Sequence, residues 1–201
     1  MTYEETIETY IKLCKQGESR KNISNIMGVS LRSVTNYQRA TGVKARLAPR
    51  LPNLDKSYFS NIDTEEKAYI LGFIFADGYL ESNDRTLTFN ISAKDIDILY
   101  KIKKALNCGN EIRNSTTNNC VKLHLSSVDL VNDLKKLGIT KCKSLIVPFP
   151  KLKEDLYKHF IRGFFDGDGH IGKRQCALVI GSNSFYEGFV EYIKTKFNKE
   201  L

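Results

Sequence analysis

Two aspartates end two similar apolar stretches of this 201-residue sequence. The stretch "YILGFIFADGYL" aligns without a gap with "FIRGFFDGDGHI", and Asp77 then pairs with Asp168. Two carboxylates held close together repel each other unless a cation lies between them. Oxygen ligands are those that Mg²⁺ prefers, and divalent cations assist in-line attack on phosphodiesters. The repeated aspartates therefore predict metal-dependent chemistry at a phosphate ester; the plainer alternative is that both acids only cap helix ends.

The elements that carry these aspartates are predicted to be two helices packed against each other. Residues 69 to 75 are apolar on nearly every side of a helix, so this helix has to be buried against a partner, and its repeat twin is the natural one. Gly72 and Gly163 hold equivalent positions and would allow the two backbones to approach closely. Packing about a pseudo-twofold axis would then bring Asp77 and Asp168 together at the helix ends.

Strands with alternating polarity follow the first of these helices. In "TLTFNIS", residues 86 to 92, apolar residues alternate with polar ones, and "VKLHLS", residues 121 to 126, does the same. This pattern predicts an α+β fold in which one sheet face covers the core and the other is exposed. The polar residues expected on or beside the exposed face are Arg85, Thr88, Asn90, Arg113, Lys122 and His124. They could bind DNA or be ordinary solvated strand residues.

Residues 1 to 48 are predicted to be a separate basic helical module. A helix is expected over residues 3 to 16, a short one with Ile23, Ile26 and Met27 over residues 19 to 27, and a third over residues 30 to 40. Short helices joined by "MGVS" resemble the helix-turn-helix family of DNA-binding modules. The resemblance implies DNA contacts from the outer side of the third helix, by Arg32, Ser33, Thr35, Asn36 and Arg39. The alternative is an ordinary helical bundle with a basic surface.

A linker, residues 49 to 64, is predicted to follow this module, and basic residues precede it. Residues 49 to 64 contain Pro49 and Pro52, which stiffen the chain. Lys44 and Arg46 lie just before these prolines and could track DNA phosphates. A plain interdomain linker without nucleic-acid contacts explains the segment equally well.

The bulk composition favours a polyanionic partner and excludes several other classes. The formal net charge is +8, as expected for a protein that binds nucleic acid. The five cysteines form no CxxC pair, which argues against a zinc site. No signal-peptide pattern is visible, and the longest apolar run is far shorter than the ~20 residues that a membrane helix needs. A soluble, cytoplasmic protein with no membrane association is therefore expected.

The stretches "ILGFIFADG", residues 70 to 78, and "IRGFFDGDG", residues 161 to 169, resemble the two motifs of the LAGLIDADG homing endonucleases. The resemblance covers residues 65 to 201 and implies site-specific cleavage of double-stranded DNA, with Mg²⁺ or Mn²⁺ as cofactor and sheets that lie along the major groove. It implies that Asp77 and Asp168 bind the catalytic metals and that Ala76 and Gly167 lend backbone carbonyls. "KCKSLIVPFP" is similar to the family segment whose lysine lies near the scissile phosphate, which implies a catalytic, electrostatic role for Lys143.

The fold that the resemblance implies is a pseudo-twofold pair of αββαββα repeats, residues 65 to 150 and 151 to 201, behind a helix-turn-helix domain. Phe75 replaces the first acid of the motif, whereas Asp166 keeps it, and this position is generally not catalytic in the family. Counterparts of residues 111 to about 150 are missing from the second repeat, so a fragment or a degenerate copy is expected. A pseudo-symmetric monomer is expected, with self-association if the second repeat is incomplete. The alternative functions are a non-cleaving DNA- or RNA-binding derivative, such as a maturase-like protein, and a transcriptional regulator.

Overall fold

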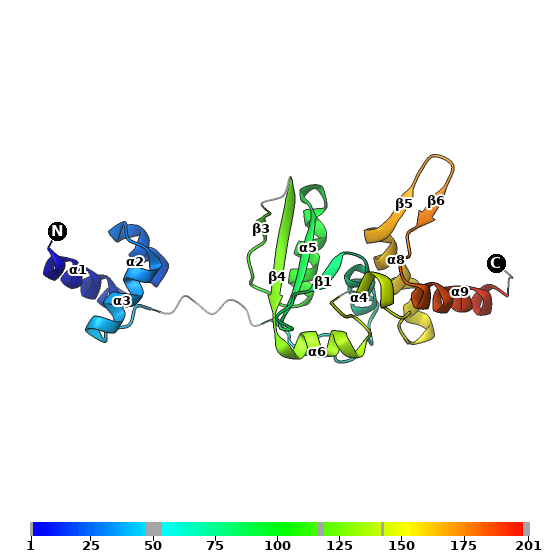
Figure 1. Cartoon of the computed structure of the whole chain (residues 1–201), viewed down its shortest axis with the longest axis horizontal. Helices are drawn as coiled ribbons and strands as arrows, with labels where there is room; N and C mark the ends of the chain where they lie inside the picture. Colours follow the sequence, from blue (N-terminus) through cyan, green and yellow to red (C-terminus); the bar gives the residue numbers. More distant parts are fainter. Residues whose placement is uncertain (1, 47–53, 116–118, 142, 199–201) are drawn as a thin grey trace. The chain divides into compact units, whose positions relative to one another are not determined.

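The computed structural model describes residues 2–46, 54–115, 119–141 and 143–198, and the chain forms two compact units, Met1–Leu51 and Pro52–Leu201. The first unit contains α1 (Tyr3–Lys15), α2 (Arg20–Met27) and α3 (Leu31–Thr41) (Figure 1). Ser19 and Ser30 cap α2 and α3 by accepting hydrogen bonds from backbone N–H groups of the first turn. Gly28 ends α2 at a φ of +65°, a left-handed conformation that glycine adopts without strain.

A small apolar core holds the first unit together. The core residues are Tyr10, Leu13, Ile23, Val34 and Ala45. The Tyr10 hydroxyl also donates a hydrogen bond of 2.7 Å to the carbonyl of Val43, which ties the segment after α3 to α1. Ile26, which lies in α2 as predicted, does not join this core, because its side chain is 59% exposed. Three short helices enclose too little volume to cover a second isoleucine one turn away from Ile23.

The first long helix of the second unit is buried over its central part, residues 70–75. The first half of this unit contains α4 (Glu65–Asp77), β1 (Gly78–Leu80), β2 (Thr86–Ser92), η1 (Ala93–Asp95), α5 (Ile96–Ala105), β3 (Arg113–Asn114), β4 (Cys120–Ser126) and α6 (Val128–Lys136). The strands form an antiparallel sheet in the order β1-β2-β4-β3, with Leu87 opposite Leu125 and Phe89 opposite Leu123. Helices α4, α5 and α6 supply buried residues to the core beneath it. The prediction of a mixed α+β fold with antiparallel strands is thereby confirmed.

The second half of this unit repeats the order helix, strand, strand, helix. It contains α7 (Lys143–Ile146), η2 (Glu154–Leu156), α8 (Tyr157–Asp168), β5 (Gly169–Ile171), β6 (Cys176–Leu178) and α9 (Asn183–Phe197). Strands β5 and β6 pair antiparallel as a separate two-stranded sheet, a hairpin that extends away from α8 (Figure 1). Across the described residues, no helix is both long and apolar enough to cross a membrane.

Helices α4 and α8 pack against each other at two glycines. A Cβ atom on Gly72 would lie 2.0 Å from the carbonyl oxygen of Phe160, and one on Gly163 would lie 1.9 Å from that of Tyr69. Each glycine therefore contacts the backbone of the opposite helix directly, and the space between the two backbones is too small for even a Cβ atom. The other side of α4 packs on the sheet, where the rings of Phe73 and Phe89 stack at 6.0 Å.

Candidate active site and nucleic-acid interface

Asp77 and Asp168 are the last residues of α4 and α8, and the close packing of the two helices brings their carboxylates to one site. The last turn of α8 touches the end of α4, since a Cβ atom on Gly167 would lie 2.4 Å from that of Ala76 and 3.0 Å from Oδ2 of Asp77. Burial raises the pKa of Asp77, and the charge of Asp168 raises it further. Burial also raises the pKa of Asp168. The site therefore disfavours two uncompensated negative charges.

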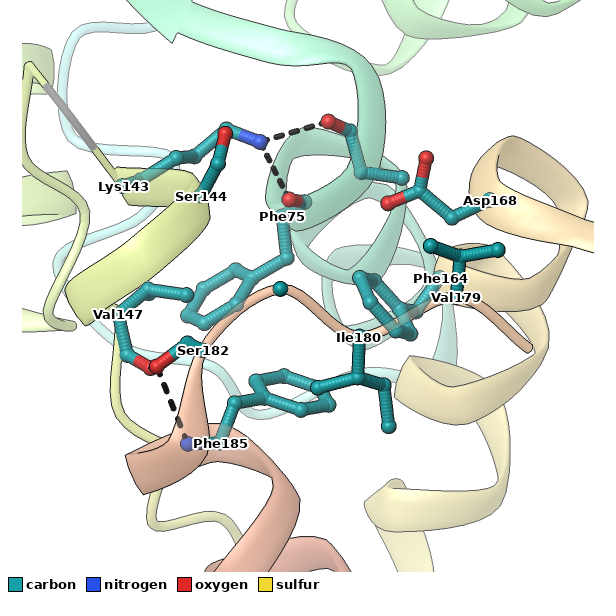
Figure 2. Close-up of a pocket in the computed structure, with 12 residues that line it drawn as sticks. Phe75, Lys143, Ser144, Val147, Phe164, Asp168, Val179, Ile180, Ser182 and Phe185 are labelled. Atoms are coloured by element: carbon teal, nitrogen blue, oxygen red, sulfur yellow. Dashed lines mark hydrogen bonds between the residues drawn. The ribbon is translucent and has the colours of Figure 1, made fainter.

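Lys143, the first residue of α7, lies in the same site and is only 6% exposed. Its Nζ donates hydrogen bonds to the carbonyls of Phe75 and Ala76, the latter at 2.6 Å (Figure 2). Carbonyls in the last turn of a helix have no partner within the helix, so the ammonium satisfies the end of α4. Burial lowers the pKa of Lys143, whereas the charges of Asp168 and Asp77 oppose this shift. Lys143 in turn lowers the pKa of both aspartates.

A pocket of about 250 Å³ opens beside these groups. Figure 2 shows Lys143 and Asp168 at its polar end, above a floor made by the rings of Phe75, Phe164 and Phe185. The walls between polar end and floor include Val147, Val179 and Ile180. An apolar floor keeps the local dielectric low, so the charges above it interact more strongly than they would in water.

The donor groups of the site fit a magnesium or manganese ion. Mg²⁺ is commonly held by one or two carboxylates and completes its octahedral shell with water and substrate phosphates. Asp77 and Asp168 offer this set, and burial raises the pKa of both carboxyls although the charge of Lys143 opposes the shift. The carbonyl of Ala76, predicted as a further ligand, already accepts the hydrogen bond from Lys143. Among the described residues there is no group of three or more His, Cys, Asp and Glu side chains that could hold a metal ion alone.

Asp77→Asn is expected to stabilise the protein at neutral pH by about 1 kcal/mol when divalent cations are absent. The pKa of Asp77 is higher in the folded than in the unfolded chain, so its charge destabilises the fold above the folded pKa. The gain should disappear as the pH falls below the ordinary pKa of an aspartate, because the wild-type carboxyl is then neutral. Urea denaturation at about pH 7.5 and pH 3.5 with EDTA measures both values. The exposed Asp97→Asn is the control, and a less stable Asp77→Asn at neutral pH would contradict the electrostatic argument.

The exposed face of the four-stranded sheet carries a row of polar and basic residues that the sequence predicted there. Asn90, Lys122 and Arg113 are cross-strand neighbours on β2, β4 and β3, and Asn90 and Arg113 are exposed. Arg85 is exposed in the turn that precedes β2. These four side chains stand where a polyanion could reach them, and they could equally be solvated strand residues.

Thr88 and His124 form the adjacent cross-strand pair on the same face. The prediction that Thr88 is exposed is wrong, because this residue is 0% exposed. Its hydroxyl donates a 2.8 Å hydrogen bond to Oε1 of Glu81 and lies 3.0 Å from Nδ1 of His124, whose side chain is 40% exposed. Glu81 was not among the predicted site residues. It follows β1 two residues beyond Tyr79, so continued strand alternation is a signal that it shares the exposed face.

The predicted DNA-contacting residues of the first unit lie on and just beyond α3. Those that are exposed are Arg32, Asn36, Arg39, Lys44 and Arg46. Ser33 and Thr35 are half-buried. The hydroxyl of Ser33 lies 2.9 Å from that of Ser30, and Thr35 accepts a hydrogen bond from Arg20 of α2. Arg20 was not among the predicted site residues, because only the packing of α2 on α3 brings it beside Thr35.

The two residues at the first acidic position of the motifs have structural contacts. Phe75 is buried, and its ring meets that of Phe160 edge to face at 5.1 Å. Asp166 is exposed and accepts a 2.7 Å hydrogen bond from the hydroxyl of Tyr69, whose ring stacks 4.8 Å from the guanidinium of Arg162. The Phe75 ring thus belongs to the floor of the pocket beside the aspartates, whereas Asp166 lines a different pocket together with Tyr69 and Arg162.

Comparisons with known proteins give short or weak likenesses. No family model matches the chain. The replication factor C small subunit of Methanocaldococcus jannaschii is 25% identical over 151 residues, which cover 67% of this chain and 8% of that protein. Transcription initiation factor IIB of the same organism is 28% identical over 123 residues, or 60% of this chain and 17% of that protein. The chain thus spans less than a fifth of either curated relative. Among solved structures, the crystal structure of I-DmoI in complex with DNA and Ca is 14% identical with a TM-score of 0.44, covering 70% of this chain and 73% of that chain.

Proposed function

We propose that this protein is a DNA-binding endonuclease that hydrolyses phosphodiester bonds of double-stranded DNA at specific sites. The observation that carries the proposal is the meeting of two equivalent carboxylates, Asp77 and Asp168, at the ends of two internally repeated helices. A structural role alone would not explain why both charges are held where burial raises their pKa values. The repeated motifs and this geometry favour a LAGLIDADG-like arrangement in which α8 to α9 belongs to the second repeat.

In this proposal, Asp77 and Asp168 are the residues that would hold Mg²⁺ or Mn²⁺. The ion, when bound, stabilises negative charge on the phosphate and lowers the pKa of water. Lys143 ties the start of α7 to the end of α4 through the carbonyls of Phe75 and Ala76. Its charge also lowers the pKa of both carboxyls, which favours their ionised form. Gly167 leaves room beside the carboxylate of Asp77.

DNA binding is proposed for both units of the chain. The sheet residues Arg85, Asn90, Arg113, Lys122 and His124 would contact the major groove near the cleaved bonds. The first unit would act as a helix-turn-helix module, with Arg32, Asn36 and Arg39 of α3 toward base edges and Lys44 and Arg46 toward phosphates. A pseudo-symmetric monomer is the proposed active form, with residues 49 to 64 linking the two units.

Cleavage of a plasmid library with random inserts tests the proposal. The full chain with Mg²⁺ or Mn²⁺ is expected to linearise a subset of plasmids, and sequencing of the ends gives the site. Asp77→Asn and Asp168→Asn should each lower the cleavage rate at that site by about a thousandfold, equivalent to several kcal/mol of lost transition-state stabilisation. The exposed Asp97→Asn should cleave as the wild type does. Cleavage that persists in both active-site variants would refute the assignment.

The second candidate is a DNA- or RNA-binding protein that does not cleave. Lys143 favours it, because a buried ammonium beside the two carboxylates offsets part of their charge without a metal ion. In that case the library is bound but not cut, and calorimetry with Mg²⁺ detects no binding that depends on Asp77 and Asp168. Binding that disappears only on deletion of residues 1 to 48 would indicate a regulator that acts through its first unit.

A further inference from the structure

A hydrogen-bonded cluster of Glu81, Thr88 and His124 lies on the exposed face of the four-stranded sheet. Glu81 follows β1, whereas Thr88 and His124 are direct cross-strand neighbours on β2 and β4. Oε1 of Glu81 lies 2.8 Å from the Thr88 hydroxyl and 3.1 Å from Nδ1 of His124. The same hydroxyl lies 3.0 Å from Nδ1, so the three groups form a closed triangle.

The donors in this triangle follow from the chemistry of the three groups. An ionised carboxylate only accepts hydrogen bonds, so both the Thr88 hydroxyl and Nδ1 of His124 have to donate to Glu81. Nδ1 therefore carries the ring hydrogen, and Nε2 of the neutral ring carries a lone pair. The strand is fixed at this point as well, because the amide of Asn110 donates a 2.5 Å hydrogen bond to the carbonyl of His124.

The location of the triangle is unusual for a carboxylate. The adjacent row on the same face carries Lys122 and Arg113, which attract a polyanion, whereas Glu81 by itself would repel phosphates. The Glu81 side chain is 30% exposed, and the ring that it holds is 40% exposed. Glu81, at the end of β1, contacts Thr88 on β2 and His124 on β4. A carboxylate that holds a partly exposed ring in this way indicates that the orientation of the His124 ring is important.

We propose that Glu81 and Thr88 are positioning residues that fix His124 as a reader of DNA sequence. The inference rests on the proposed function, in which this sheet face enters the major groove. Nε2 then accepts a hydrogen bond from an exocyclic amino group, the N6 amino of adenine or the N4 amino of cytosine, which are the donors that base pairs present there. Guanine O6 and N7 and thymine O4 are acceptors and are disfavoured at this position.

The tautomer of His124 can be measured without DNA. In ¹⁵N-histidine-labelled full-length protein at about pH 8, long-range ¹H–¹⁵N spectra distinguish the Nδ1–H form, the Nε2–H form and the doubly protonated ring. The sequence contains only three histidines, and His124→Gln identifies the signal. We expect the Nδ1–H form in the wild type and a shift toward the Nε2–H form in Glu81→Ala and Thr88→Val. The exposed Glu187→Gln, which also removes one negative charge, should leave the spectrum of His124 unchanged.

Selection of bound DNA from a random pool measures the base preference. The wild type should select adenine or cytosine at one position. Glu81→Ala should lower that single preference by about fivefold, as expected for one hydrogen bond, while the preferences at other positions remain. Thermal unfolding of each variant shows that the fold is intact. A change of overall affinity without a change at one position would show a purely electrostatic role for Glu81 and would overturn the proposal.

The two measurements separate failure of this inference from failure of the proposed function. A wild-type ring in the Nε2–H or doubly protonated form overturns the positioning role whether or not DNA binds. If Glu81→Ala selects DNA with the same base preferences as the wild type, only the base-reading role is overturned. A wild type that binds no DNA in the pool refutes the proposed function and, with it, base reading.

Discussion

Gly163→Ala is expected to lower the free energy of unfolding of the second unit by more than about 3 kcal/mol. The added Cβ atom would lie 1.9 Å from the carbonyl oxygen of Tyr69 and 3.1 Å from the backbone nitrogen of Phe73. These are backbone atoms of α4, which cannot rotate away as a side chain can. Helices α4 and α8 would have to separate, and the apolar contacts between them would be lost along with the meeting of Asp77 and Asp168. Urea denaturation followed by circular dichroism measures the loss of stability.

Gly172→Ala is the matched control for this prediction. A Cβ atom at Gly172 would have its nearest neighbour at 3.4 Å, the side chain of His170, so a change within about 0.5 kcal/mol is expected. Gly72→Ala should resemble Gly163→Ala, because its Cβ atom would lie 2.0 Å from the carbonyl oxygen of Phe160. Equal stability of Gly163→Ala and Gly172→Ala would mean that α4 and α8 do not cross at these glycines.

Lys143→Met is expected to destabilise the protein by about 2–4 kcal/mol at neutral pH. The variant keeps the apolar stem of the side chain but leaves the carbonyls of Phe75 and Ala76 without their donor. It also removes the positive charge that lowers the pKa of Asp77 and Asp168, so both pKa values should rise further. Protonation of the carboxyls removes their repulsion, and the loss of stability should therefore be smaller at about pH 4 than at pH 7.5.

Lys141→Met provides a comparison two residues away. Lys141 is also paired with a carboxylate, at 2.7 Å from Asp84, but the two side chains are 45% and 42% exposed to solvent. Solvent screens such a pair, so only a small change is expected. Two results would contradict the argument that the buried ammonium offsets the charges of Asp77 and Asp168. One is equal stability of Lys143→Met and Lys141→Met, and the other is a loss of stability of Lys143→Met that is the same at both pH values.

The helix pair illustrates what the sequence could predict. Residues 69 to 75 are apolar on every side, and such a helix has to be buried, as α4 is. The gapless repeat pointed to α8 as its partner, and the two glycines lie where the backbones touch. Lys143 was inferred only from a family resemblance, with a position near a phosphate. The structure buries it against carbonyls of α4, a contact between residues far apart in the sequence that no periodicity reveals.

The sheet illustrates why the remaining part could not be predicted. Alternation assigned Thr88 to the correct face of β2, since its cross-strand neighbour is His124. Alternation says nothing about what lies above that face, where Glu81 and His124 contact the Thr88 hydroxyl and the residue is fully buried. Likewise, Ile26 lies in the same helix as Ile23, as predicted, but periodicity did not reveal that its side chain is exposed. Burial by a neighbouring side chain depends on tertiary packing rather than on local pattern.

The two carboxylates come from helices that touch in space but lie far apart in the sequence. This separation has a consequence for the protein during its synthesis. A nascent chain that has left the ribosome only as far as α6 carries Asp77 but neither Asp168 nor α8, the helix against which α4 packs. Under the proposed function, such an intermediate can touch DNA but cannot damage it. If both aspartates are needed, as proposed, cleavage would become possible only after α8 has been synthesised and has packed against α4.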